Sequence, residues 1–474
     1  GSVSAGARGG VSAMMDLSGV RMLVHGLGLS GMAVIQAAVP RGASVCACDD
    51  RDEARAAMLP ELTRLGVPLL TPDEAASGEF DLCVVTPGVR PGNALVSALE
   101  RRGVELISEI ELAARLAPCP IAAVTGTNGK STTTVLAGLM LRASGLRCGI
   151  GGNLSAEGYD LPLITAAVTE PADDALCAEV SSAQLERCYQ FRPKAAALLN
   201  ITPDHFDRYA GMDDYAAAKM RIFQAQHETD FAVLGLDDPM ASALGAGVRA
   251  RKLWFSARQE PNEGAFLRGD ALVLRFEGDE QEFCRTGEMR LWAPHDWLNA
   301  AAAACIARAM GATIHGIREA AVTFPGLADR MEHCATIGGV RWINSSMCTN
   351  PAAGAAAVRA VAERFPAVVI AGGAGKKLDY AEWGEAVARS AKRLLLIGKS
   401  ASDLQQAAEA AGANSIEMFE TMREAMEAAR CLAQPGDAVI LAPAMASFGE
   451  FQNFRERGRV FRQIVSTFGK EAEQ

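Results

Sequence analysis

Short apolar runs and longer amphipathic stretches alternate along this chain. The apolar runs, which are typical of buried strands, lead into glycine-containing loops and then into helical patterns. The same alternation starts again near residue 121 and near residue 326, so there are three series in a row. Because strands that alternate with helices form parallel sheets covered by helices, the pattern predicts an α/β fold. The strands expected most clearly are residues 20–25, 43–48, 81–85, 121–125, 176–179, 195–200, 231–236, 342–344, 367–372, 393–397 and 438–441.

The expected domain boundaries follow from these series. Residues 1–18 lack an apolar signal core and are interpreted as a flexible tail. We expect a first domain over residues 19–115, a central domain over residues 116–325 and a third domain over residues 326–474. Residues 253–291 alternate and are rich in Phe, Trp and Val, which predicts antiparallel strands at the edge of the central sheet. An alanine-rich helix is expected at residues 295–310.

Composition narrows the class of protein. With 49% apolar and 22% charged residues, the 474-residue chain has a globular composition and is long enough for several domains. The net charge of −10 argues against a nucleic-acid partner, which would need a basic face. No apolar run reaches membrane-spanning length, so no membrane partner is expected. The 12 cysteines form no CxxC pair, which gives zinc and disulfide frameworks little support and favours a reducing cytoplasm.

The first candidate site is the loop Gly26-Leu27-Gly28-Leu29-Ser30-Gly31, which fits the GxGxxG pattern between a strand and a helix. Asp49 and Asp50 follow about twenty residues later, where an acid meets a ribose hydroxyl in dinucleotide-binding folds. The pattern fits a nucleotide or phosphate ligand, NAD among them. Glycines that only allow a helix to pack closely on a strand would look the same. No second signature of a nicotinamide enzyme accompanies the loop.

The loop Gly126-Thr127-Asn128-Gly129-Lys130-Ser131-Thr132 is a stronger signal, because it follows an apolar strand and opens a helix. Backbone N–H groups at a helix start attract anionic oxygens. The lysine can reach the terminal phosphates, and the serine hydroxyl can bind Mg²⁺. Val124 occupies the place of the usual first glycine, so the segment is interpreted as a shortened phosphate loop.

Other polar residues follow strand ends, the edge where open α/β sheets bind ligands. Glu179 ends a strand near the phosphate loop, where a carboxylate can hold Mg²⁺ or simply face solvent. Residues 200–209, NITPDHFDRY, gather ionisable groups around His205 and favour a functional site. His295 and Asn299 share one helix face, which suits a nucleotide and local packing equally well. In the third series the candidate loops are residues 344–351, 372–376 and 447–454.

Taken together, the segments GTNGKST, AEVSSAQLE, LLNITPDHFDRY, AAAKMRIF, GGAGKK and PAMASFGEFQNFRERG resemble the Mur ligase family over essentially the whole chain after the tail. The phosphate loop is shared by the wider family, which includes folylpolyglutamate synthases. GLGLSG and SFGEFQNFRERG are more specific to its glutamate-adding branch. The resemblance implies a Rossmann-like UDP-binding domain, a central P-loop-type ATPase domain and a Rossmann-like C-terminal domain that brings the amino acid.

The resemblance also implies a function. A monomer would use ATP to join glutamate, with D-glutamate favoured, to UDP-N-acetylmuramoyl-L-alanine in the cytoplasmic synthesis of peptidoglycan precursors. The implied catalytic residues are Lys130, His205 and Lys219, with Lys219 carbamylated. The residues implied for ATP are Gly126, Thr127, Asn128, Gly129, Lys130, Ser131, Thr132, His295, Asn299 and Arg330. Those implied for two Mg²⁺ ions are Ser131 and Glu179 for one, and His205 and Lys219 for the other.

The substrate-binding residues are carried over in the same way. The UDP part would contact Leu29, Ser30, Asp49, Asp50, Arg51 and Gly88, and the muramoyl part would contact Asn153 and Ser181. The amino acid would contact Thr349, Lys376, Ser447 and Phe454. A lysine and hydroxyl groups are suited to hold carboxylates.

One loop departs from the family pattern. After the Trp-Ile-Asn strand the family usually reads Asp-Ser-Lys-Ala-Thr-Asn, whereas residues 345–350 here read Ser-Ser-Met-Cys-Thr-Asn. The acid expected to reach the nucleotide and the lysine expected to face the phosphates are both replaced, and Asp296 replaces a family Asn. Arg330 and Lys376 are candidates to compensate. Three alternatives stay open: a ligase for L-glutamate or another acceptor, a nucleotide-binding paralogue without ligase activity, and an NAD-dependent oxidoreductase.

Overall fold

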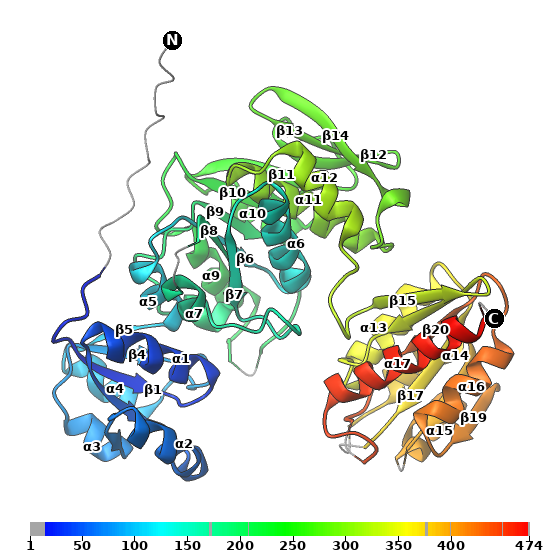
Figure 1. Ribbon diagram of the computed structural model, residues 1–474, viewed down its shortest axis with the longest axis horizontal. Helices are drawn as coiled ribbons and strands as arrows, with labels where there is room; N and C mark the ends of the chain where they lie inside the picture. Colours follow the sequence, from blue (N-terminus) through cyan, green and yellow to red (C-terminus); the bar gives the residue numbers. More distant parts are fainter. Residues whose placement is uncertain are drawn as a thin grey trace. The chain divides into compact units, whose positions relative to one another are not determined.

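The computed structural model describes residues 15–169, 173–206, 208–374, 378–398, 400–447 and 449–472. The chain divides into two compact units, Gly1–Phe324 and Pro325–Gln474 (Figure 1). Most of the predicted tail (residues 1–14) lies outside the described residues, as does the predicted amino-acid ligand Lys376. Among the described residues, no helix is long and apolar enough to cross a membrane. All twelve cysteines are free thiols.

The first unit begins with a five-stranded parallel sheet in the order β3-β2-β1-β4-β5. Its strands are β1 Arg21–His25, β2 Ser44–Cys48, β3 Leu69–Leu70, β4 Leu82–Val85 and β5 Glu105–Ile107. The helices between and after them are α1 Leu29–Ala38, α2 Asp52–Arg64, α3 Pro72–Ser77, α4 Ala94–Arg101 and α5 Glu109–Leu116. All four residues of β4 are buried, as expected for a strand covered on both faces.

A nine-stranded sheet follows in the same unit, in the order β14-β13-β12-β11-β10-β9-β6-β8-β7. Its strands are β6 Ile121–Thr125, β7 Cys148–Gly152, β8 Ala175–Glu179, β9 Ala195–Leu198, β10 Phe231–Gly235, β11 Arg251–Ser256, β12 Gly264–Arg268, β13 Ala271–Phe276 and β14 Asp279–Arg285. The pairing is parallel from β7 to β12 and antiparallel only for β12–β13 and β13–β14. The prediction of antiparallel strands from residue 253 onward was therefore wrong for β11, because alternation does not encode strand direction.

The remaining helices of the first unit lie on this second sheet. They are α6 Lys130–Ala143, α7 Leu163–Val168, α8 Ser182–Leu185, α9 Met212–Met220, α10 Pro239–Gly245, α11 Pro294–Ala309 and α12 Ile314–Thr323. Helix α11 is the predicted alanine-rich helix, and residues 299–307 are all buried. Small side chains let α11 lie close to α6 and to the strands beneath both helices.

The second unit contains a six-stranded sheet in the order β15-β16-β20-β17-β18-β19, parallel except for β15. Its strands are β15 Glu332–Ile337, β16 Val340–Asn344, β17 Ala367–Gly372, β18 Ala391–Ile397, β19 Ile416–Phe419 and β20 Ala438–Leu441. Its helices are α13 Pro351–Ala362, α14 Ala381–Ser390, α15 Ala401–Ala410, α16 Met422–Leu432 and α17 Phe454–Ala472. Helix α17 is held to the sheet by Phe461 and Phe468, whose ring centroids lie 6.2 and 5.4 Å from that of Trp342.

Candidate functional site

The shortened phosphate loop connects β6 to α6 at the carboxyl edge of the nine-stranded sheet. Gly129 has φ +83°, a conformation that favours glycine. A Cβ atom there would lie 2.3 Å from Oδ1 of Asn299, so only glycine fits between the loop and α11. Lys130, the first residue of α6, donates from Nζ to the carbonyl of Thr127 over 2.9 Å. The lysine therefore folds back over the loop that would hold the phosphates.

Glu179 lies beside the start of α6. Its carboxylate is buried and accepts hydrogen bonds from Oγ of Ser131 (2.6 Å) and from Nδ2 of Asn153 (3.2 Å). Three residues predicted from separate motifs thus meet at one point. A buried carboxylate next to a serine hydroxyl is a donor set suited to Mg²⁺. Among the described residues, no group of three or more His, Cys, Asp or Glu side chains could hold a metal ion.

Lys219, on α9, is buried. Its Nζ donates to the carbonyl of Gly126 over 2.8 Å and lies 4.4 Å from the ring centroid of Tyr215. Burial, together with the nearby charge of Lys130, lowers the pKa of Lys219 to about 7. A large share of this amine is therefore uncharged near neutral pH, as a nucleophile for CO₂ must be.

His205 follows β9 and is exposed. Its φ of +55° is rare for a residue with a side chain, and such strain clusters at functional sites. Its ring meets that of Tyr215 edge-on with centroids 5.9 Å apart, and its Nε2 lies 3.6 Å from Asp204. Tyr215, which the sequence analysis missed, thus contacts both His205 and Lys219. The only available signal was its position four residues before Lys219 on the same helix.

Two predicted residues of α11 have different surroundings. His295 is exposed in the first turn, with Nε2 3.6 Å from Asp296. Asn299 is buried, and its Oδ1 accepts from Oγ1 of Thr133 at 3.4 Å. Asn299 therefore supports α6 and the phosphate loop. Ser181 caps α8 by accepting from the backbone of Gln184 and lies at the strand end that also carries Glu179.

The five-stranded sheet carries a cavity of about 690 Å³ at its carboxyl edge. Its walls include the residues predicted for the UDP part, namely Leu29, Ser30, Asp49, Asp50, Arg51 and Gly88. The glycines of GLGLSG also have a packing role, because a Cβ on Gly31 would lie 1.9 Å from the carbonyl oxygen of Gly26. The packing explanation of that motif is therefore confirmed, whereas ligand binding by the loop stays a prediction.

The acids of this cavity are held in place by their neighbours. Burial raises the pKa of Asp49, but the N–H groups of Leu27 and Arg51 outweigh it, so the pKa lies below its ordinary value. Asp50 accepts from Nδ2 of Asn93 (2.8 Å) and lies 3.2 Å from Nε2 of the buried His25. His25 and Asn93 were not predicted, because no motif links them to the glycine loop.

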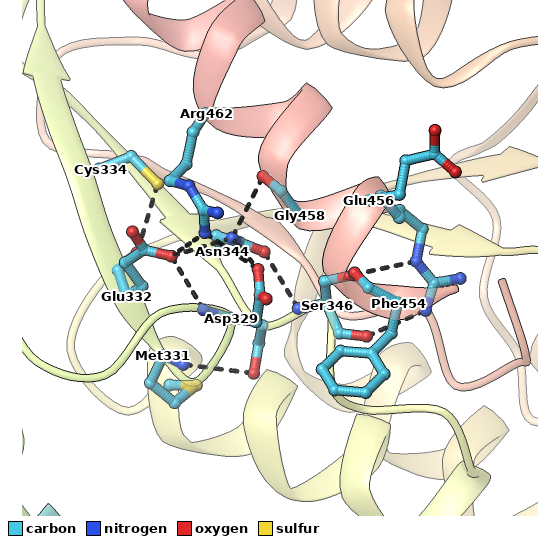
Figure 2. A network of polar contacts seen from close by, with 12 residues as sticks. Asp329, Met331, Glu332, Cys334, Asn344, Ser346, Phe454, Glu456, Gly458 and Arg462 are labelled. Carbon is cyan, nitrogen blue, oxygen red and sulfur yellow. Dashed lines mark hydrogen bonds and ion pairs between the residues drawn. The ribbon is translucent and has the colours of Figure 1, made fainter. Parts of the chain in front are cut away.

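In the second unit, the described residues among those predicted for the amino acid follow β16 and β20. Ser447 is buried after β20, Thr349 is half-buried after β16, and Phe454 begins α17. Ser346 Oγ donates to the carbonyl of Phe454 over 2.7 Å, which joins two of these segments (Figure 2). Arg330 donates from Nε to Sδ of Met347 at 3.0 Å, so it contacts the loop that departs from the family pattern.

Comparison with known proteins agrees with these observations. The Mur ligase middle domain matches residues 124–307, and the Mur ligase, glutamate ligase domain matches residues 329–445. The UDP-N-acetylmuramoylalanine–D-glutamate ligase of Pelotomaculum thermopropionicum is 41% identical over 460 residues, covering 96% of this chain and 100% of the relative. The enzyme of the same name from Caldanaerobacter subterraneus is 36% identical over 462 residues, covering 95% and 99%.

Solved structures show the same fold at lower identity. A pseudomurein peptide ligase type C from Methanothermus fervidus (15% identical) and the UDP-N-acetylmuramate–alanine ligase of Thermotoga maritima (17% identical) both align with a TM-score of 0.56. Each alignment covers 94% of this chain and 99% of the other. The two domain matches and the near full-length relatives lead to one conclusion: the chain belongs to the Mur ligase family.

Proposed function

We propose that the chain is an ADP-forming ligase that joins D-glutamate to UDP-N-acetylmuramoyl-L-alanine in the synthesis of peptidoglycan precursors. The observation that carries the proposal is the identity of 36–41% to relatives with this named activity over nearly the full length of both chains. The residues that meet around the phosphate loop support it independently. A monomer in the cytoplasm is part of the proposal.

In this proposal, the domain around each sheet binds a different part of the substrates. The first domain (residues 19–115) is Rossmann-like and holds the UDP part in the 690 Å³ cavity, which GLGLSG and the two aspartates border. The central domain (residues 116–325), of P-loop type, holds ATP with the phosphate loop, His295 and Asn299, and the muramoyl part with Asn153 and Ser181. The third domain (residues 326–474), also Rossmann-like, contributes Arg330 to ATP and holds glutamate with Thr349, Lys376, Ser447 and Phe454.

The chemical problem is to form an amide from a carboxylate and an amine, which is unfavourable in water. In the proposed reaction a carboxylate oxygen of the muramoyl-alanine attacks the γ-phosphorus of ATP, and ADP leaves. The glutamate nitrogen then attacks the resulting acyl phosphate, loses its proton, and phosphate departs. No protein nucleophile is needed, so the residues act by positioning the substrates and neutralising charge.

The residues around the phosphate loop fit these tasks. The ammonium of Lys130 and the first N–H groups of α6 would bind phosphate oxygens, as a helix start favours anions. Ser131 and Glu179, already 2.6 Å apart, would hold one Mg²⁺ ion, and His205 and Lys219 would serve a second. Mg²⁺, when bound, would neutralise negative charge on the phosphates.

Lys219 fits a metal site only after modification. Its uncharged amine would add to CO₂ and lose a proton, which converts a cation into a carbamate with two oxygen donors. Its burial and its pKa of about 7 support this chemistry, because an ordinary lysine is almost fully protonated at neutral pH. The carbonyl of Gly126 orients Nζ beneath the phosphate loop.

The deciding experiment is a phosphate-release assay with ATP, UDP-N-acetylmuramoyl-L-alanine and either glutamate isomer. We expect release that requires all three substrates and is faster with D-glutamate. Faster release with L-glutamate would replace the proposed substrate. A second candidate, a nucleotide-binding paralogue without ligase activity, is motivated by Ser345 and Met347, which replace the family acid and lysine. It would be supported by ATP binding without phosphate release for any acceptor.

A further inference from the structure

Arg457 is a buried arginine in the first turn of α17, with 1% of its surface exposed. Its guanidinium donates from Nε to Oγ of Ser346 (3.1 Å) and from Nη2 to the carbonyl of Ser346 (2.9 Å). Nη1 donates to the carbonyl of Gly372 at 3.4 Å. Nη1 and Nη2 both donate to the carbonyl of Met445, each over 3.4 Å. One side chain thus contacts the segments after β16 and β20 and the end of β17.

These segments are the ones that carry the proposed glutamate-binding residues. Thr349 follows Ser346 by three residues, and Ser447 follows Met445 by two. Phe454 is joined directly, because its carbonyl accepts from the Ser346 hydroxyl (Figure 2). The same hydroxyl accepts from Nε of Arg457. The chain after β17 leads to Lys376, which lies outside the described residues. Arg457 therefore forms hydrogen bonds with the segments that carry the proposed glutamate-binding residues.

The chemistry of the contact set is specific for arginine. All its partners are neutral carbonyl or hydroxyl oxygens, and no carboxylate forms an ion pair with Arg457 among the described residues. Burial lowers the pKa of Arg457 to about 10, which still leaves it charged at neutral pH. A planar fork with five N–H donors can serve several loops at once, whereas a lysine ammonium has three donors at one point.

A separate network fixes the other end of the same loop. Nδ2 of Asn344 donates to Asp329 (2.9 Å) and Glu332 (3.0 Å), and Nη1 of Arg462 donates to both carboxylates over 3.0 Å (Figure 2). The Oδ1 of Asn344 accepts from the N–H of Ser346 over 3.0 Å. Ser346 is thus held from its backbone on one side and by Arg457 on the other.

We infer that Arg457 is a positioning residue for the amino-acid site: through Ser346, Gly372 and Met445 it sets the spacing of the segments that bind glutamate. The inference rests on the proposed function, since it names a determinant of that site. It predicts that loss of the Arg457 guanidinium selectively weakens binding of glutamate. The binding sites on the first unit should keep their affinity for their ligands.

The test compares Arg457→Lys, which keeps the charge, and Arg457→Met with the full-length parent. KM is measured separately for D-glutamate, ATP and the UDP-linked substrate. For both variants we expect KM for glutamate to rise at least about tenfold, from the loss of hydrogen bonds worth about that factor. KM for the UDP-linked substrate should stay within about twofold. Arg459→Met is the matched control, because Arg459 lies on the same helix with 61% of its side chain exposed.

Each result decides between explanations. An unchanged glutamate KM in folded Arg457→Lys, or equal losses for all three substrates, would overturn the positioning role. So would a Lys variant that cannot fold, because Arg457 would then be purely structural. A parent that releases no phosphate with either glutamate isomer would overturn the proposed function and this inference together. An active parent with unchanged variants would overturn the inference alone.

Discussion

Replacing Lys219 by methionine tests two effects of the buried amine: its role in catalysis and its effect on the free energy of unfolding. In the folded chain the pKa of Lys219 is about 7, whereas its ordinary value is 10.5. Between these values the unfolded chain binds more protons than the folded chain. The free energy of unfolding of the parent therefore rises with pH across this window. The methionine variant lacks that contribution.

The magnitude follows from the two pKa values. One group contributes up to about 1.4 kcal/mol for each pH unit within the window, and less near pH 7, where the folded lysine is still partly protonated. From pH 7 to pH 9 the parent should thus gain about 2 kcal/mol relative to Lys219→Met. The measurement is urea unfolding of both proteins at both pH values in buffer free of CO₂. Added bicarbonate should stabilise only the parent, because CO₂ would bind only its folded amine.

The same variant should be nearly inactive in phosphate release. In Lys219→Ala, short carboxylic acids should partly restore activity, since they supply the missing oxygen ligands, whereas bicarbonate should not. Lys252→Met is the control for removing a lysine that donates to one carbonyl, because Lys252 Nζ donates to Val248 over 2.8 Å from a half-buried position. Full activity of Lys219→Met, or the same pH dependence of unfolding in variant and parent, would refute the reasoning.

Three further predictions concern the other sites. Lys130→Ala should lower turnover at least about 100-fold with the fold retained, as judged by circular dichroism, because its charge is needed at the phosphates; near-normal turnover would contradict the phosphate loop. Calorimetry should show that the first domain binds the UDP-linked substrate far more tightly than NAD, and the reverse order would refute the assignment of its cavity. Ser345→Asp with Met347→Lys should leave turnover equal or higher and lower KM for ATP roughly ten- to a hundredfold; loss of activity would mean that the loop serves another partner.

The parts of the fold that could be predicted are those encoded by local pattern. Residues 121–125 and 367–372 were predicted as strands and form β6 and β17 with the same bounds, because continuous apolar runs identify doubly covered parallel strands. The strands β3 and β19 were missed, since β3 has only two residues and β19 is a short strand that is only partly buried. Their pairing depends on neighbours distant in sequence.

The candidate site likewise contains residues that local sequence indicates and residues whose contacts form only on folding. The interpretation of Gly129, Lys130 and Ser131 as part of a phosphate loop needed only their spacing, and it stays a prediction. The burial of Lys219 could not be predicted, because its helix has no clear apolar face and only tertiary packing places Nζ against Gly126. The contact of Tyr215 with both Lys219 and His205 also arises only in the folded chain. Local sequence identifies groups able to do chemistry, whereas packing sets their pKa values.

The altered loop at residues 345–348 is internally hydrogen-bonded. Its polar groups are satisfied without the family acid and lysine: the N–H of Cys348 donates to the carbonyl of Ser345 (3.0 Å), and that of Met347 donates to Asp329 (3.1 Å). The Ser345 hydroxyl and Cys348 thiol lie 3.3 Å apart, and Ser345 is fully buried. A loop that folds without those two charges does not need them for stability. Because the Ser345 side chain is buried, the fold of the double variant is checked by circular dichroism before a change in its KM for ATP is assigned to ATP contacts.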